Sequence, residues 1–266
     1  MSDLKIGLAL SGGGARGFCH IGVLKVLEEH GIKPYAITGT SMGAIVGGIY
    51  ASGASLSDLI EFSENIRNDK IADWNLFNIY RNSLFKGRKA RKIFEKFAKV
   101  ENIEDCPTKF SCVAFDVKSG KKIIFDKGNL VENIYSSMAV PALFRPLEKE
   151  GMLLIDGGVL NNMPHELLKD MGCDLIICVD AIGEYDGYKY KKNAVNSIIN
   201  VMNIFIREQQ KFLADSNNIV ITPKLDGLMS FTFNKETAIK AMQEGEIAAK
   251  ESIDAIIEAI RKLKGD

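Results

Sequence analysis

Several features are missing from this 266-residue sequence, and each absence argues against a class of function. Neither charge is in excess, because Lys and Arg together number 34 and so do Asp and Glu. A balanced chain has no overall attraction to nucleic acid or to an anionic membrane, so any such contact must come from a local patch. We therefore expect no nucleic-acid partner.

Cysteine pairs of the metal-binding or redox type are also missing. The five cysteines form no C-x-x-C motif, and their odd number leaves at least one unpaired. This pattern argues against a zinc site or a disulfide framework and is typical of reduced thiols in a cytoplasmic protein.

The chain passes from Met1-Ser2-Asp3 directly into an apolar segment, so we expect no signal peptide. We also expect no cofactor and no bound metal.

A membrane-spanning helix is the third absence. The run from Pro34 to Ser57 carries no charge, and Gly39, Gly43 and Gly47 have the spacing of a helix-dimer motif. However, hydroxyl side chains and five glycines interrupt the run, so its hydropathy is modest. A buried strand followed by a buried helix explains this segment better.

Short apolar strands alternate with helical segments along the chain. This alternation predicts a mostly parallel central sheet with helices on both faces, which is a three-layer α/β fold. We expect one domain over residues 1–266, with a lid-like insertion around 66–100, and Ser57 as the cap of the third helix. The predicted strands are 5–10, 35–40, 109–115, 122–126, 152–155, 175–179 and 219–221, and the predicted helices are 18–30, 42–52, 56–65, 88–99, 130–138, 165–171, 195–206 and 249–263.

The centre of the functional argument is Gly39-Thr40-Ser41-Met42-Gly43, at the junction of the second strand and the next helix. The G-x-S-x-G spacing is typical of a nucleophile elbow, in which a serine occupies a strained turn and its flanking glycines let the strand and helix approach. The helix N-terminus favours negative charge beside the serine oxygen. Ser41 is therefore a candidate nucleophile.

A second glycine motif, Gly12-Gly13-Gly14-Ala15-Arg16-Gly17, follows the first strand. It fits the dinucleotide fingerprint, but that function needs an acidic residue after the second strand, and none occurs between Glu29 and Asp58. The alternative is an oxyanion hole, in which the glycine N–H groups face the reacting carbonyl oxygen. Arg16 could brace this loop or meet an anionic head group, and the alternative is a solvated side chain on the first helical turn without such a role.

The base that activates Ser41 is harder to find, because the chain has only three histidines. His20 and His30 precede the serine, and only His165 follows it, so a triad with Asp156 stays open as an alternative. Asp156 is the better candidate, because it ends an apolar strand and is followed by two glycines. As a base it needs a raised pKa, which desolvation can supply.

Taken in order, G-G-G-x-R-G, G-T-S-M-G and D-G-G closely resemble the motifs of the patatin-like phospholipase family, especially its small bacterial members. The resemblance runs from Lys5 to the final helix and includes 136–141 and 156–164. It implies lipid acyl hydrolysis by a Ser–Asp dyad, with Ser41 as nucleophile and Asp156 as base. It implies an oxyanion hole formed by Gly12, Gly13 and Gly14, with Arg16 nearby. Ser11 departs from the family, because many members have Asp there.

The segment over residues 71–99 combines aromatic residues with seven basic ones against a single Glu95 in its second half. This composition suits peripheral contact with an anionic membrane surface, although aromatics packed on the core and a solvated basic helix explain it equally simply.

The preferred function is a cytoplasmic serine hydrolase of phospholipid or lysophospholipid acyl esters. The alternative is a non-catalytic lipid-binding or regulatory module on the same fold.

Overall fold

The computed structural model describes residues 4–73, 83–183, 197, 201, 204–208 and 218–265. Within these ranges a central sheet has the strand order β10-β9-β1-β2-β4-β8-β7, with β5 also paired to β4, and β3 pairs with β6 in a separate sheet. The strands are β1 (Ile6–Leu10), β2 (Ala36–Gly39), β3 (Ser83–Phe85), β4 (Lys109–Asp116), β5 (Lys121–Phe125), β6 (Ala142–Phe144), β7 (Leu147–Lys149), β8 (Met152–Asp156), β9 (Leu175–Val179) and β10 (Asn218–Ile221).

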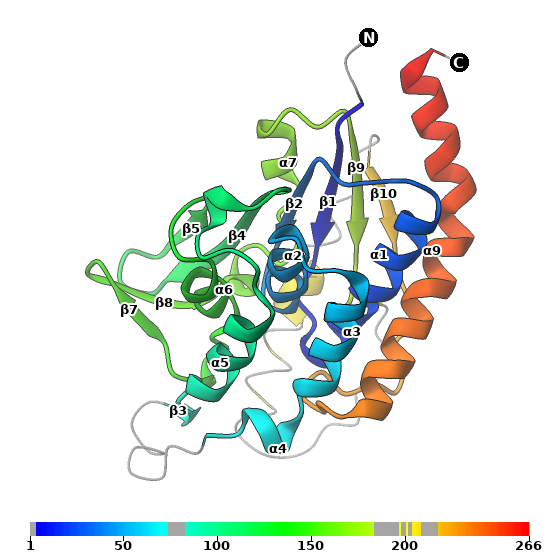
Figure 1. The fold of residues 1–266 in the computed structure, drawn as a ribbon. Helices are drawn as coiled ribbons and strands as arrows, with labels where there is room; N and C mark the ends of the chain where they lie inside the picture. Colours follow the sequence, from blue (N-terminus) through cyan, green and yellow to red (C-terminus); the bar gives the residue numbers. More distant parts are fainter. Residues whose placement is uncertain are drawn as a thin grey trace.

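Five adjacent strands of the central sheet, from β10 to β4, run parallel. Their carboxyl ends therefore meet at one edge of the sheet, which is the lower edge in Figure 1. Strands β5 and β8 both pair antiparallel with β4, and β7 pairs antiparallel with β8. The predicted mostly parallel α/β sheet is confirmed, and the predicted strands 109–115 and 122–126 form a hairpin as β4 and β5.

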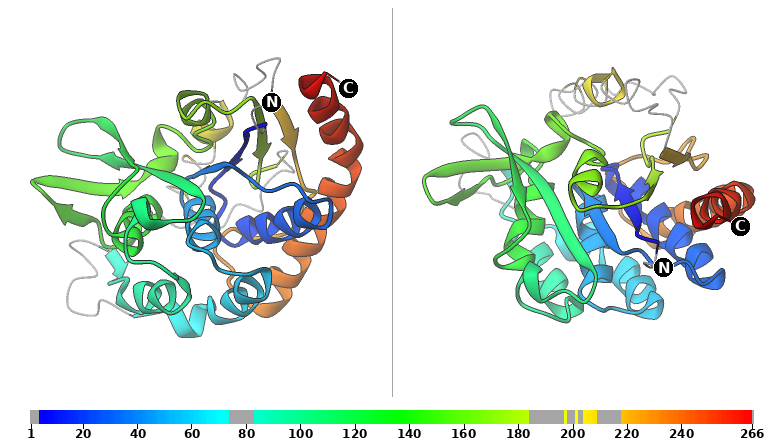
Figure 2. Two further views of the ribbon diagram at one scale, coloured as in Figure 1. Left: turned by 45° about the horizontal axis from the view of Figure 1, so that its top comes forward. Right: turned by 90° about the horizontal axis from the view of Figure 1, so that it is seen from above.

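Helices lie on both faces of this sheet, with most of them on one face and α7 on the other (Figure 2). The α-helices are α1 (Cys19–Glu29), α2 (Met42–Ala51), α3 (Leu56–Asn65), α4 (Asn68–Ile71), α5 (Arg88–Phe97), α6 (Leu130–Met138), α7 (Glu166–Asp170) and α9 (Lys235–Lys264), and the short 3₁₀ helices are η1 (Gly14–Phe18), η2 (Ile103–Asp105) and η3 (Gly157–Val159).

The two faces of the sheet carry side chains of different size, because successive strand residues point to opposite sides. Leu8, Ile37 and Ile177 belong to the larger core, together with residues of α1, α2 and α6. Ala9 and Cys178 face the smaller core, which α7 covers. Small residues on the second face let a short helix cover it closely.

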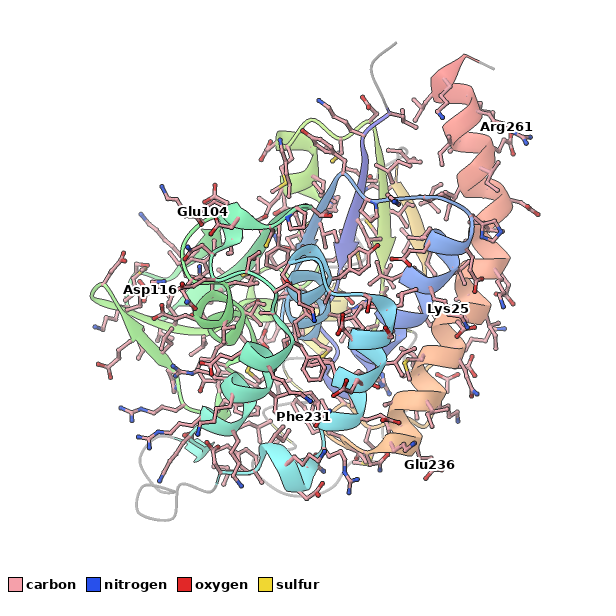
Figure 3. All side chains as sticks on the ribbon, viewed as in Figure 1. Lys25, Glu104, Asp116, Phe231, Glu236 and Arg261 are labelled. Atoms are coloured by element: carbon pink, nitrogen blue, oxygen red, sulfur yellow. The ribbon has the colours of Figure 1, made fainter. Side chains whose placement is uncertain are left out.

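The long C-terminal helix α9 packs along α1 and so supports the glycine loop that precedes α1 (Figure 1). The two helices approach at glycines: a Cβ atom at Gly22 would lie 2.0 Å from the Met242 carbonyl oxygen, and one at Gly245 would lie 2.1 Å from that of Cys19. Lys25, labelled in Figure 3, pairs with Glu246 at 2.9 Å beside this contact.

One predicted helix cap is wrong. Ser55, not Ser57, caps α3: its Oγ accepts a hydrogen bond from the Asp58 N–H at 3.1 Å, and the Asp58 carboxylate accepts one from the Ser55 N–H at 2.8 Å. This is a capping box, which requires an acidic residue three positions after the cap. Asp58 stands three positions after Ser55, whereas Ile60 stands three after Ser57.

Most of the predicted helix over 195–206 lies outside the described residues, as do the aromatic residues Trp74, Phe77 and Tyr80. Residues 204–208 are helical. Among the helices of the described ranges, none is both long enough and apolar enough to cross a bilayer. All five cysteines are free thiols, as predicted.

Candidate active site

Ser41 occupies a strained turn between β2 and α2. Its backbone has φ 55° and ψ −121°, a left-handed conformation that non-glycine residues rarely adopt. A Cβ atom at Gly39 would lie 2.5 Å from the Gly43 carbonyl group, and one at Gly43 would lie 2.1 Å from the Leu10 carbonyl oxygen. Both glycines are therefore needed for close approach, as the elbow motif predicts.

The elbow is held by a serine from α6 whose role the sequence did not indicate. The Ser41 N–H donates to Ser137 Oγ at 3.0 Å, and the Ser137 hydroxyl donates to the Val113 carbonyl oxygen at 2.7 Å. Val113 lies on β4, next to Ala114, which pairs with Asp156. Ser137 thus connects the backbone of Ser41 to β4, the strand that pairs with Asp156.

The glycine loop lies next to Ser41, and its N–H groups have different surroundings. The Gly12 N–H donates to the Asn162 carbonyl oxygen at 3.2 Å, and the Ala15 N–H donates to the Ser230 carbonyl oxygen at 2.6 Å. The N–H groups of Gly13 and Gly14 have no acceptor among the residues the structure describes. Both glycines line the chamber that contains Ser41, so these two groups are available to an anionic oxygen.

His20 supports the glycine loop from behind. Its Nε2 lies 2.8 Å from the Ser11 carbonyl oxygen, and since that oxygen can only accept, Nε2 carries the proton. Burial lowers the pKa of His20 to about 4, so the imidazole is neutral at neutral pH. On its other side the loop is fixed by the Ala181 N–H, which donates to Ser11 Oγ at 2.8 Å.

Arg16 is buried and braces two further loops. Its Nε donates to the Leu228 carbonyl oxygen at 2.7 Å, and its Nη1 donates to the Ile182 carbonyl oxygen at 2.9 Å. Of the two roles considered for Arg16, these contacts favour the bracing one. Its guanidinium reaches main-chain oxygens rather than the chamber that contains Ser41.

Asp156 is the last residue of β8, at the end of a buried strand as the sequence predicts, and β8 runs antiparallel to β4. Strand β4 continues past Cys112, which is level with Gly39 of β2, and β8 returns along this extension until Asp156 lies opposite Ala114. The sequence does not indicate this direction, because the apolar run 152–155 reads the same in either orientation.

The Asp156 carboxyl group is buried and its pKa is raised to about 6. Desolvation raises the pKa, while hydrogen bonds from the Gly158 N–H and the Ser41 side chain lower it. The Gly158 bond is 2.8 Å long and occupies Oδ1. Asp156 can therefore change its charge close to neutral pH, as a general base must.

The segment after Asp156 is attached to β2 by two threonine side chains. Thr40 Oγ1 donates to the Asn161 carbonyl oxygen at 2.8 Å, and Thr38 Oγ1 donates to that of Pro164 at 2.9 Å. These bonds bring Asn162 against Gly12, where its Nδ2 donates to the Gly12 carbonyl oxygen at 3.4 Å. Asn162 thus joins the two halves of the site, a role that its sequence position alone does not reveal.

Neither His165 nor His30 takes part in this arrangement. His165 Nδ1 lies 3.2 Å from the Met163 carbonyl oxygen and 3.7 Å from Glu166 Oε2. His30 Nδ1 lies 2.8 Å from the Val26 carbonyl oxygen at the end of α1. Neither residue lines a chamber next to Ser41.

Two chambers meet at Ser41 and Gly14. The polar chamber is bordered by the glycine loop, Asp156 and Asn162. The apolar chamber lies between α2, α4, α5 and the end of α6. Apart from Ser41 and Gly14, its lining residues are hydrocarbon or methionine side chains. Phe231, labelled in Figure 3, lines both.

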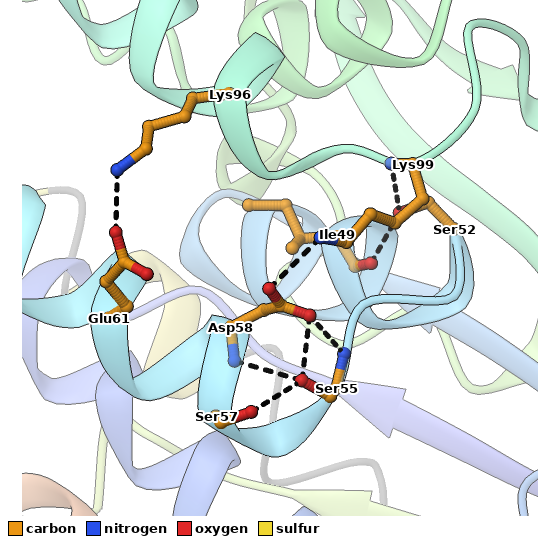
Figure 4. Close-up of polar contacts among 8 residues, drawn as sticks. All are labelled: Ile49, Ser52, Ser55, Ser57, Asp58, Glu61, Lys96 and Lys99. Atoms are coloured by element: carbon orange, nitrogen blue, oxygen red, sulfur yellow. Dashed lines mark hydrogen bonds and ion pairs between the residues drawn. The ribbon is translucent and has the colours of Figure 1, made fainter.

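Two of the basic residues in and after α5 form ion pairs within the protein. Lys96 pairs with Glu61 at 2.6 Å and Lys99 with Asp58 at 3.0 Å, which ties α5 to α3 (Figure 4). The Arg91 guanidinium lies 4.1 Å from the centre of the Tyr135 ring. The side chains of Arg88 and Lys92 contact no acidic group in the described part of the chain.

Comparison with known proteins places the chain in a family. The sequence model of the patatin-like phospholipase family matches residues 8–169. The chain belongs to the patatin-like phospholipase family. The resemblance predicted from the sequence motifs is therefore confirmed.

Relatives from two groups of organisms are about one-third identical to this chain over the aligned residues. An uncharacterized NTE family protein of Mycobacterium bovis is 33% identical over 186 residues, covering 70% of this chain and 51% of the relative. The Lysophospholipase NTE1 of Pyricularia oryzae is 34% identical over 186 residues, covering 68% of this chain. The chain thus spans about half the length of the first relative and 12% of the second.

Solved structures share the fold at low sequence identity. VipD from Legionella pneumophila superposes with a TM-score of 0.61 at 16% identity, covering 95% of this chain and 67% of that one. Human GIVD cytosolic phospholipase A2 superposes with a TM-score of 0.56 at 11% identity, covering 97% of this chain and 58% of that one. At these identities the likeness concerns the fold alone.

Proposed function

We propose that this chain is a serine lipid acyl hydrolase in which Ser41 is the nucleophile and Asp156 the base. One observation carries the proposal: Ser41 and a carboxyl group with a raised pKa share a chamber with two N–H groups that have no acceptor among the described residues. A nucleophile, a base and oxyanion donors are the three groups that acyl transfer requires.

The first half of the reaction forms an acyl-enzyme. Ser41 Oγ attacks the ester carbonyl carbon, and its proton moves to the Asp156 carboxylate. The carbonyl oxygen becomes an oxyanion that accepts hydrogen bonds from the N–H groups of Gly13 and Gly14. When the bond between the carbonyl carbon and the alcohol oxygen breaks, Asp156 returns the proton to that oxygen.

The second half regenerates the enzyme with water as the nucleophile. Water attacks the acyl carbon and gives one proton to Asp156, which returns it to Ser41 Oγ as the carboxylic acid leaves. In this scheme Gly12 and Arg16 hold the oxyanion loop rather than contact the oxyanion, because their donors already bind protein carbonyl groups. This refines the predicted set to Gly13 and Gly14.

We propose a lysophospholipid or another fatty-acyl ester as the substrate. The apolar chamber beside Ser41 suits a hydrocarbon chain. Relatives named as lysophospholipases support the same substrate class. We also propose contact with an anionic bilayer through Arg88 and Lys92 of α5, which have no acidic partner among the described residues.

A fluorophosphonate probe tests the nucleophile. The probe is expected to label the wild type and to spare Ser41→Ala, while Asp156→Asn abolishes turnover in a lipid-class hydrolysis screen. His165→Ala serves as the control, because His165 lies outside both chambers, and most activity is expected to remain. Labelling of Ser41→Ala at the wild-type rate would contradict the assignment.

The rival function is a non-catalytic lipid-binding or regulatory module. The same screen separates the two, because a folded protein without turnover on any acyl ester would support the module. Binding of a radiolabelled lysophospholipid without its consumption would support it further.

A further inference from the structure

The two chambers beside Ser41 differ in one respect that gives them separate roles. Asp156 lines the polar chamber and is absent from the lining of the apolar one, whereas Ser41 and Gly14 line both. The reacting carbon therefore lies at the junction, with the base on one side only. An ester bound there must place its two halves on different sides.

The path of the proton decides which half goes where. In acyl transfer the group that accepts the serine proton later donates it to the leaving oxygen, so the leaving alcohol must be within reach of Asp156. That requirement puts the alcohol in the polar chamber. The acyl chain then extends from the carbonyl carbon in the other direction, into the apolar chamber.

We propose that the apolar chamber holds the acyl chain and that helix α5, through Ala90 and Phe94, determines the chain length the enzyme accepts. This inference rests on the proposed function. Ala90 and Phe94 are four residues apart, so both face the chamber from the same side of α5. Ile71 of α4 lines the chamber beside them.

The wall formed by α5 is fixed at both ends. At its beginning the N–H groups of Gly87, Arg88 and Lys89 donate to the Asp73 carboxylate at 2.9, 2.7 and 3.2 Å. At its end the bonds of Lys96 and Lys99 hold it to α3 (Figure 4). A helix restrained at both ends can limit chain length because it does not move aside for a longer chain.

Aromatic packing fixes the side chain of Phe94 as well. The Phe62 and Phe94 rings are 6.2 Å apart, and the Phe62 and Phe97 rings are 5.6 Å apart. Ala90 is the smallest side chain on this wall, and it is buried. A larger side chain at position 90 would occupy space that the chain needs, whereas a smaller one at position 71 would extend that space.

Phe97 provides a matched control. It lies on the same helix, is equally buried and packs on the same Phe62 ring, but it does not line the chamber. Phe97→Leu therefore tests the effect of disturbing α5 without changing the chamber wall.

The experiment compares Ala90→Leu, Ile71→Ala and Phe97→Leu with the wild type. The readout is the ratio of second-order labelling rates for dodecyl and ethyl fluorophosphonates, confirmed by kcat/KM for dodecanoate and acetate esters. A ratio is independent of the fraction of each variant that folds. Ala90→Leu is expected to lower it on the order of tenfold, as changes of one or more methylenes do in apolar sites. Ile71→Ala is expected to raise it, and Phe97→Leu to leave it within about twofold.

The outcomes separate this inference from the proposed function. Unchanged ratios in both chamber variants, with Ser41 still labelled, would overturn the chamber assignment alone. Equal losses for both chain lengths would do the same, because they would indicate a structural effect. Absence of Ser41-dependent labelling in the wild type would overturn the proposed function itself.

Discussion

The backbone N–H of Ser41 donates a hydrogen bond of 3.0 Å to the hydroxyl oxygen of Ser137. Ser137 in turn donates to β4, the strand that Asp156 pairs with, at 2.7 Å. Two residues that are 96 positions apart in the chain thus share one buried hydrogen bond at the strained turn. Because the turn has an unfavourable backbone conformation, the contacts around it must hold it in place.

Ser137→Ala is expected to lower kcat with little change in KM. The substitution leaves the Ser41 N–H and the Val113 carbonyl oxygen without their buried partner, at a cost of about 1–3 kcal/mol in stability. A small displacement of Ser41 costs on the order of 10²-fold in rate. Steady-state kinetics on a soluble ester measure both constants.

Ser136→Ala is the control for this change, because Ser136 is the preceding residue and is equally buried. Among the described residues its hydroxyl bonds only within α6, to the Glu132 carbonyl oxygen. Equal losses of kcat in the two variants would argue against a positioning role for Ser137.

The proposed base predicts the pH dependence of activity. With the pKa of Asp156 raised to about 6, the carboxylate form that can accept a proton predominates above that pH. We expect kcat/KM for an uncharged ester to rise with pH and to level off above about pH 6, because kcat/KM reports the pKa of the free enzyme. A midpoint near the ordinary pKa of an aspartate, about 4, would contradict the burial argument.

The same raised pKa predicts that the free energy of unfolding falls as pH rises, whereas activity rises. Asp156 binds its proton more tightly in the folded chain than in the unfolded one, so this contribution to stability is full below pH 4 and is lost as pH rises through about 6. The loss amounts to about 3 kcal/mol. Asp156→Asn removes the charge, so its stability relative to the wild type should increase by up to that amount between pH 4 and pH 8. Urea unfolding at the two pH values measures it.

Much of this fold could be predicted from local patterns, but the relationships within the site could not. The elbow at Ser41 and the motif at Asp156 are recognisable because their glycines carry a local requirement for close approach. The antiparallel direction of β8 cannot be recognised from the sequence, because an apolar run reads the same in both directions. Ser137 reads as an ordinary helix residue until α6 is placed beside the elbow.

Contacts of the glycine loop also could not be predicted from the sequence. The N–H of Gly12 is occupied by an oxygen of Asn162, which is 150 residues away, and that partner exists only once the chain has folded. His20 is fully buried, with its Nε2 on the Ser11 carbonyl oxygen, and the helical pattern of residues 18–30 does not show this contact. Such contacts depend on tertiary packing and leave no local signal.

The close approach at the elbow predicts unequal costs for two alanine substitutions. In Gly43→Ala the new Cβ atom would lie 2.1 Å from the Leu10 carbonyl oxygen, so β1 and α2 must move apart. We expect a loss of about 3 kcal/mol or more. Gly172→Ala has no atom within 4 Å of its Cβ position and a φ of 78°, so it carries only the left-handed strain of about 1–2 kcal/mol. Chemical denaturation of both variants tests the difference, and equal costs would contradict it.

The proposed membrane contact predicts that charge reversal on α5 weakens binding to anionic vesicles more than the same charge reversal elsewhere on the protein. Reversing Arg88 and Lys92 to Glu removes two α5 cations whose side chains have no acidic partner among the described residues. Each basic residue near an anionic surface contributes about 1 kcal/mol, so binding to phosphatidylserine vesicles is expected to fall on the order of tenfold or more. Reversing Lys121 and Lys127, at the two ends of the β5 region, gives the same change in net charge and serves as the control. Vesicle sedimentation measures both variants, and an equal loss in the two would show that net charge, rather than the α5 surface, governs binding.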